Sequence, residues 1–389
     1  MVMVVGVSLV VLVLCWLTAE DYGISWDEKV QRQYGVLALD YYRTLGEDTR
    51  CNNFLNLRYY TPVYETALHV AAKQAAPWQL GPPAYPTPLA AEYAVRHTLN
   101  SVVGVSALLA TGCIAQLVRR VRGAAPPPVV VVLLLAATPR FHGHFFANTK
   151  DVPFAAAFAW SMVGILCTLD AICPGSGLAS STQKASATVA LRLPWGSGVA
   201  TALAVGFTVS LRSAGLLLLP MAAVGLLATI ANAYAMHDQV QLPPLPRALL
   251  WVVVTVCSLW LGIVALWPAA LEAPFSHPVQ TVMESVHFST VVRMRFSGGD
   301  AWSNTLPRRY YLEMFGLTLP LPMLLCLCGG LAHAICSVVA RRRAVPVPAA
   351  AEKAEQPNTD ASPARLTVDV PILLILMWAL MPMVMFLAK

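Results

Sequence analysis

The stretch VMVVGVSLVVLVLCWL at residues 2–17 carries no charge, and the acidic stretch TAEDYGISWDE follows it at residues 18–28. A continuous apolar run is typical of a helix that crosses a bilayer, whereas strands of a membrane barrel alternate polar and apolar residues. Similar runs recur along all 389 residues, of which 57% are hydrophobic and 12% charged. Because soluble domains are about a quarter charged, the sequence predicts an all-α, polytopic membrane protein.

The apolar runs predict about nine spans, two of which are short for a bilayer core that needs about 20 residues. The first run also fits a signal peptide, but it lacks a basic start, so we favour a retained span. The predicted spans are Val2–Leu17, Leu99–Val118, Ala124–Thr138, Val152–Ala171, Gly198–Leu211, Ser213–Ala235, Ala248–Trp267, Met314–Val339 and Val370–Leu387.

The chain thus divides into a transmembrane module at residues 1–340, a linker at 341–369 and a last span at 370–389. The linker is rich in Ala, Pro and Glu, and we expect it to be cytoplasmic and disordered. We expect no large soluble domain after the last predicted span.

Arginine clusters orient the predicted spans. Arg119, Arg120 and Arg122 follow the second span, and residues 341–343, all arginine, follow the eighth, so both clusters can lie on the cytoplasmic side. The loops at 18–98, 139–151 and 268–313 are then non-cytoplasmic. The clusters account for much of the basic excess behind the net charge of +6, and no nucleic acid partner is predicted.

Acidic residues come first in these loops. Asp27 and Glu28 follow the first span closely, and a carboxylate there can act as a general base that deprotonates an acceptor hydroxyl. The alternative is a helix start, with Ser25 as the cap and Glu28 at the capping-box position.

Cationic residues gather in the stretch PRFHGHFFANTKDVP at residues 139–153. Arg140 and Lys150 can hold a lipid phosphate and neutralise it as a leaving group. The alternative is a snorkelling loop at the interface. His142 and Asp151 lie near a further histidine, but this spacing is weak evidence for a divalent metal, and no metal is predicted.

Two other arginine positions stand out. Arg212 splits a long apolar stretch, and because a charge in hydrocarbon costs several kcal/mol, it must lie at a turn or a wet cavity. A phosphate fits its fork of donors, and an ordinary interfacial turn is the alternative. Arg308 and Arg309 flank the eighth span on the outside, against the positive-inside bias, which indicates an anionic partner.

In their order, these features resemble the GT-C superfamily of glycosyltransferases, and most of all the glycosyltransferase family 39 type. That type includes protein O-mannosyltransferases and bacterial aminoarabinose transferases. The resemblance covers roughly residues 20–335, and no single motif in it is diagnostic. It is carried by Trp26-Asp27-Glu28, residues 59–65, Arg96-His97, residues 139–153 and residues 198–220.

The resemblance implies a GT-C-like fold with a partly helical first loop, in the endoplasmic reticulum membrane or a bacterial inner membrane. It implies an inverting enzyme that takes a sugar from a polyprenyl- or dolichyl-phosphate donor to an unknown protein, glycan or lipid acceptor. Asp27 would be the base, Glu28 its support and Asp151 a second acid. Arg140, Lys150 and Arg212 would bind the donor phosphate, and Tyr60, His142, Asn148, Arg308 and Arg309 the substrates.

Two other classes of protein stay open. A transporter or lipid flippase needs ionisable residues deep inside several spans, and apart from Arg212 and flanking acids the predicted spans are bare. A non-catalytic membrane subunit can keep the same fold, since fold alone does not give function.

Overall fold

The computed structural model describes residues 1–75, 88–122, 125–174, 188–286, 291–330, 332 and 368–387. Five helices in it are long and apolar enough to cross a membrane. Residues 341–367 of the predicted linker lie outside the described residues. The five helices are α1 (Val2–Thr18), α4 (Pro88–Arg122), α7 (Asp151–Ile172), α9 (Leu218–Met236) and α10 (Leu245–Val264).

The other four predicted spans fall on shorter or bent segments. Helix α5 (Pro128–Ala136) meets α6 (Pro139–Ala147) at 68°, and α13 (Arg309–Thr318) meets the helix Leu321–Gly330 at 117°. Counting each bent pair as one span gives up to seven. Helices α8 (Trp195–Leu211) and α15 (Val370–Leu387) are the remaining apolar segments, the second described as apolar over Val370–Met381. A total of nine spans stays a prediction.

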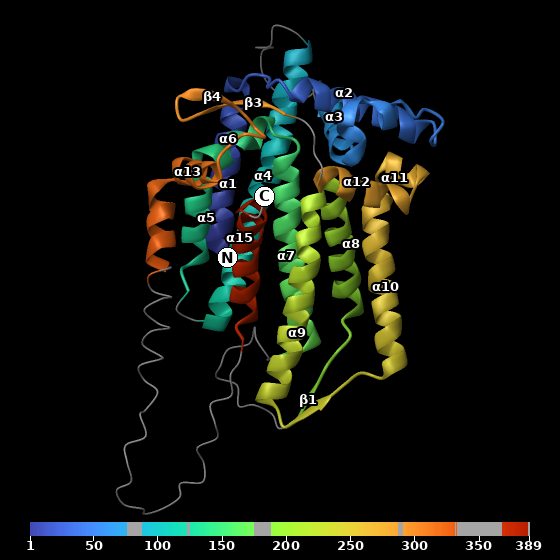
Figure 1. Ribbon diagram of the computed structural model, residues 1–389, viewed down its shortest axis with the longest axis vertical. Helices are drawn as coiled ribbons and strands as arrows, with labels where there is room; N and C mark the ends of the chain where they lie inside the picture. The colour runs from blue at the N-terminus through green and yellow to red at the C-terminus, as the bar shows by residue number, and fades with distance from the viewer. Residues whose placement is uncertain are drawn as a thin grey trace, which may run out of the picture.

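The membrane-length helices run side by side along the long axis of the molecule (Figure 1). Shorter elements gather at the upper end of this bundle in the same view. The predicted first loop is partly helical, with α2 (Glu28–Arg43) and α3 (Val63–Ala75) joined through the 3-10 turns η2 (Arg50–Asn53) and η3 (Leu55–Tyr59). Helices α11 (Pro268–Glu272) and α12 (Ser276–Val286) lie at the same end.

The prediction of a loop at residues 139–151 is wrong in one respect, because residues 139–147 form helix α6. Pro139 explains the bend, since a proline at the first turn of a helix has no N–H to continue the preceding one. Helix α6 therefore turns away from the axis of α5 and lies across the end of the bundle.

The prediction of a mostly helical fold is confirmed, and two small two-stranded sheets accompany the helices. Strand β1 (Thr188–Ala190) pairs in parallel with β2 (Gln239–Gln241). Strand β3 (Arg293–Phe296) pairs antiparallel with β4 (Gly299–Trp302). Ser297 and Gly298 join this hairpin with φ angles of +50° and +81°, and two positive φ values match the twist that a two-residue hairpin turn requires.

Small residues allow α8 and α10 to approach closely. A Cβ atom on Gly206 would lie 2.1 Å from the Leu259 carbonyl oxygen, and one on Gly262 would lie 2.5 Å from that of Leu203. Small residues at a crossing are the usual means by which membrane helices pack backbone against backbone. The end of α8, where Arg212 follows, is thereby held against α10.

We expect Gly206→Ala to destabilise the protein by about 1–3 kcal/mol, because the new methyl group must push two backbones apart. Gly196→Ala on the same helix is the matched control, because its Cβ atom meets nothing within 4 Å. Thermal unfolding in detergent measures both. Equal unfolding midpoints for the two variants would contradict the close crossing.

Candidate functional site

A cluster of opposite charges lies where the starts of α2 and α7 meet the end of α8. Lys150 Nζ lies 3.0 Å from Asp27 Oδ2, and Arg212 Nη1 lies 2.6 Å from Asp151 Oδ1. All four side chains are partly exposed. Because Lys150 and Asp151 are consecutive, with Cα atoms about 3.8 Å apart, the two ion pairs form one site, here called the charge cluster.

Asn148 shapes the backbone that carries half of the charge cluster. Its Oδ1 accepts the backbone N–H of Lys150 at 3.2 Å and of Asp151 at 2.8 Å. Its Nδ2 donates to Asp151 Oδ2 at 3.0 Å. An asparagine that binds the N–H groups just after it is a common local turn, and here the turn starts α7 with an acid in its first turn, which the helix dipole favours.

Asn100, a fully buried residue of α4, fixes the same turn from behind. Its Nδ2 donates to the carbonyl oxygens of Phe145 at 2.8 Å and Asn148 at 3.3 Å. Its Oδ1 accepts the hydroxyl of Tyr64 at 2.6 Å. One amide thus joins α3, α4 and the end of α6, so the charge cluster rests on a rigid support.

A buried ion pair lies beneath α3. Arg96 Nη2 donates to Glu65 Oε2 at 2.5 Å, and the Arg96 residue is 0% exposed. Burial raises the pKa of Glu65, while the Arg96 charge opposes that rise. Arg96 lies one turn before Asn100 on α4, so the buried pair and the support of the charge cluster share one helix.

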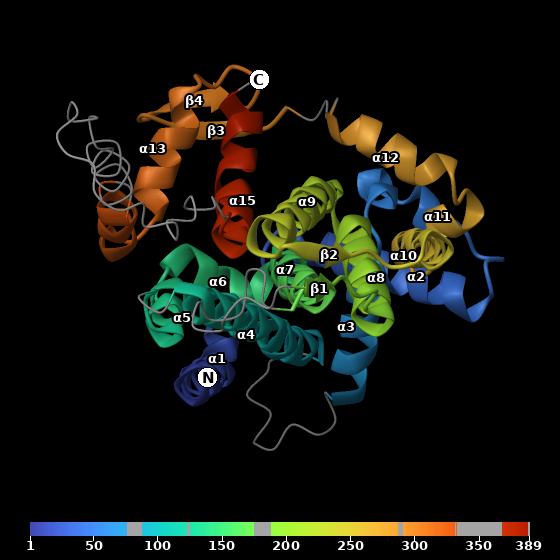
Figure 2. The same ribbon diagram turned by 90° about the horizontal axis from the view of Figure 1, so that it is seen from below.

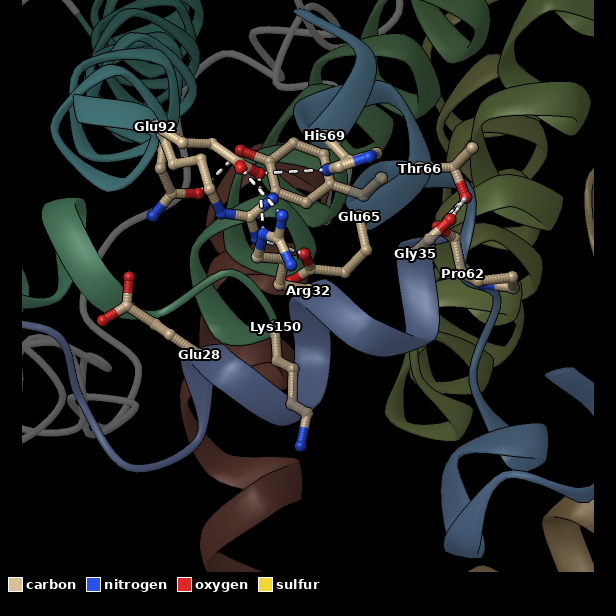
Figure 3. A network of polar contacts seen from close by, with 12 residues as sticks. Glu28, Arg32, Gly35, Pro62, Glu65, Thr66, His69, Glu92 and Lys150 are labelled. Carbon is tan, nitrogen blue, oxygen red and sulfur yellow. Dashed lines mark hydrogen bonds and ion pairs between the residues drawn. The ribbon is translucent and has the colours of Figure 1, made fainter. Parts of the chain in front are cut away.

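A second, largely buried group of polar side chains surrounds Glu92 on α4 (Figure 3). Arg32 binds Glu92 through two parallel bonds of 2.7 and 2.8 Å, and His69 Nδ1 lies 3.1 Å from the same carboxylate. Burial lowers the pKa of His69 despite its contact with Glu92. The three residues come from α2, α3 and α4, so this contact holds the two short helices on the bundle end.

Asp27 and Glu28 face different environments although they are neighbours. Glu28 is buried, with Oε1 2.8 Å from His97 Nε2 and Oε2 accepting the Ser25 N–H at 2.6 Å. The Ser25 bond is the backbone half of the predicted capping box, although α2 begins only at Glu28. Asp27 instead reaches the charge cluster and is the more accessible carboxylate of the two.

The other predicted site residues on the first loop and on α6 lie in different surroundings. The Tyr60 ring centroid is 6.0 Å from Lys150 Nζ, which brings Tyr60 to the charge cluster. His142 packs on Phe145 and Phe146, with ring centroids 5.6 and 5.8 Å away. Arg140 is exposed on α6 and makes no ion pair among the described residues.

Arg308 and Arg309 do not join the charge cluster in the described part of the chain. Arg309 pairs with Glu313 one turn further along α13, at 3.2 Å. Figures 1 and 2 both separate α13 from α2 and α3. The two arginines therefore belong to another surface at the same end of the bundle.

The sequence prediction missed most of the buried groups as site residues. Glu65 and the Arg96-His97 pair lie in stretches that resemble the GT-C family, which was the available signal. No sequence signal marked Arg32, His69 and Glu92. Arg32 and His69 contact Glu92 across 60 and 23 positions of the sequence. No three His, Cys, Asp or Glu side chains gather as a metal site within the described residues.

No protein-family model, curated protein or solved structure matches the chain. The fold itself defines the class: a mostly helical protein with five to seven helices suited to cross a membrane. The geometry of the charge cluster therefore carries the functional argument.

We expect Arg96→Met to destabilise the protein by about 3–5 kcal/mol, because it leaves the Glu65 carboxylate buried without its partner. Arg43→Met, at an exposed position on α2, is the control with the same change of side chain. The double variant Glu65→Leu with Arg96→Met is expected to lose less than the sum of the single losses, since neither charge remains. Unfolding in detergent measures the unaltered protein, the three single variants (Arg96→Met, Glu65→Leu and Arg43→Met) and the double variant. Strictly additive losses for Arg96→Met and Glu65→Leu would contradict a coupled pair.

Proposed function

We propose that the chain is an inverting glycosyltransferase that moves a sugar from a polyprenyl- or dolichyl-phosphate donor to an acceptor hydroxyl at the non-cytoplasmic face. One observation carries the proposal. Asp27 and Arg212 are 185 positions apart, yet both pair with the consecutive residues Lys150 and Asp151 at one end of the bundle. A carboxylate and two cations thus meet where a lipid headgroup would lie.

The proposed reaction assigns one task to each charge. The Asp27 carboxylate takes the proton of the acceptor hydroxyl while that oxygen attacks the anomeric carbon. The bond from this carbon to the phosphate oxygen breaks, and its electron pair stays on the departing lipid phosphate. The phosphate therefore gains one negative charge, which Lys150 and Arg212 stabilise.

Arg212 is suited to this task by a free donor. Its Nε is buried and has no hydrogen-bond partner among the described residues, while Nη1 binds Asp151. Arginine presents its donors as a planar fork that matches two phosphate oxygens. Because Nε is buried, a phosphate would reach it only after the guanidinium turns away from Asp151.

The resting ion pairs also explain how the base would be released. The charge cluster holds two acids and two cations, so each charge already has a partner. A donor phosphate would compete with Asp27 for Lys150 and with Asp151 for Arg212. Partly exposed ion pairs contribute only about 0–1 kcal/mol, so the exchange costs little and leaves the Asp27 carboxylate free to accept a proton.

The placement of basic residues supports the proposed sidedness. Arg119 and Arg120 lie near the last turn of α4, whereas Arg96 and Asn100 lie in its first half, next to the charge cluster. If Arg119 and Arg120 face the cytoplasm, the charge cluster faces the opposite side. A nine-span GT-C-like arrangement would give the same orientation.

We expect Asp27→Asn to lower sugar transfer by about 10²–10⁴-fold, because the amide cannot accept the acceptor proton. The assay offers dolichyl- and undecaprenyl-phosphate sugars to the purified protein in vesicles and follows transfer and donor hydrolysis. Asp21→Asn is the matched control, since Asp21 is an exposed acid six positions earlier. Full turnover by Asp27→Asn would remove Asp27 from the role of base.

The same assay separates the two competing classes. Donor binding without turnover in the unaltered protein would indicate a non-catalytic subunit. Neither binding nor turnover, together with flux of a solute or lipid in sealed vesicles, would indicate a transporter. Either outcome would overturn the proposed transferase.

A further inference from the structure

Helix α12 lies across the end of the bundle and projects past it. Figure 2 views the bundle from the opposite end, and no span covers α12 in that view. The inner face of α12 is attached: His277 is buried, and its Nε2 lies 2.9 Å from the Arg58 carbonyl oxygen. Thr281, one turn later, is buried as well.

The outer side of α12 carries two exposed stripes of opposite character. Phe275, Val279 and Met283 are 75%, 54% and 60% exposed, and their four-residue spacing places them on one face. Ser276, Gln280 and Glu284 are exposed and polar. Each polar residue follows an apolar one, about 100° further round the helix.

A ring contact gives the direction of the apolar stripe. Phe275 stacks on Trp260 of α10, with ring centroids 5.7 Å apart and planes inclined by 17°. Trp260 lies four residues before the end of α10 at Val264, which is about 6 Å back along that helix. The Phe275 side chain therefore points toward the level of the spans, and Val279 and Met283 share its face.

The apolar stripe also continues the surface of α10. Val256 and Leu261 on α10 are more than half exposed, as expected for a helix that faces lipid. A face that continues this surface meets the same surroundings. The exposed charged side chains described on α11 and α12, Glu272 and Glu284, are both acidic. Attraction to anionic headgroups therefore does not contribute.

We propose that α12 is an interfacial helix whose partner is the bilayer leaflet at the charge-cluster end. Phe275, Val279 and Met283 lie at the boundary of acyl chains and headgroups, and the polar stripe faces water. Burial of apolar area in zwitterionic lipid suffices to hold such a helix. This inference is independent of the proposed reaction.

The position of α12 bears on the charge cluster. Helix α12 contacts η5 (Ser213–Leu217), the 3-10 turn that directly follows Arg212. A helix held at the leaflet surface on one side and against η5 on the other sets the depth of Arg212 relative to the headgroups.

Photocrosslinking in phosphatidylcholine vesicles tests the proposal with the full chain. Benzoylphenylalanine, whose excited ketone inserts into a nearby C–H bond, replaces Val279 or Met283, and Gln280 or Glu284 in matched variants. Mass spectrometry then measures covalent lipid adducts. We expect several-fold more lipid adduct at Val279 and Met283 than at the two polar positions.

Equal adduct yields at the four positions would overturn the proposal. Crosslinks from Val279 or Met283 to a second copy of the chain would also overturn it, because the face would then bind protein. Phe275→benzoylphenylalanine keeps an aromatic ring in place and is the fallback if another variant fails to fold. It is expected to give lipid adducts, and their absence there would count against the proposal.

Discussion

The Glu65–Arg96 ion pair is the interaction on which the upper end of the molecule depends. A buried ion pair compensates the loss of hydration only when its geometry is well kept, so α3 and α4 have little freedom to move apart. Asn100, one turn after Arg96 on α4, donates to the carbonyl oxygens of Phe145 and Asn148. The position of the turn at residues 148–151 therefore depends on this pair.

Two kinds of charge pair serve two purposes in this arrangement. The Glu65–Arg96 pair is buried, and in the Arg32–Glu92 pair the carboxylate is nearly so. In the Asp27–Lys150 and Asp151–Arg212 pairs both side chains are partly exposed, and an ion pair there contributes little to stability. A proposed catalytic group needs both conditions, a rigid support and a side chain that can leave its resting partner. The same contrast distinguishes buried Glu28 from accessible Asp27, although the two are adjacent in sequence.

The sequence predicted the features that depend on local composition. Apolar runs located the membrane helices. The high energy of a charge in hydrocarbon predicted a turn or a wet cavity at Arg212, which has extended backbone just after α8. The bend at Pro139 and the hairpin at Ser297-Gly298 were missed, although both have local signals. The Arg32–Glu92 contact could not be predicted, because hydropathy along one chain does not reveal which polar side chains meet across 60 residues.

The central claim is that the charge cluster binds a lipid-linked phosphate, and a binding titration of dolichyl phosphate to Arg212→Gln tests it most directly. Arg295→Gln, an exposed arginine on the β3–β4 hairpin, is the matched control. A hydrogen bond to a charged group contributes about 1.5–3 kcal/mol, or roughly 10–100-fold in affinity. The account predicts a loss of that size for Arg212→Gln and none for Arg295→Gln. Unchanged affinity in Arg212→Gln, or an equal loss in both variants, would contradict it.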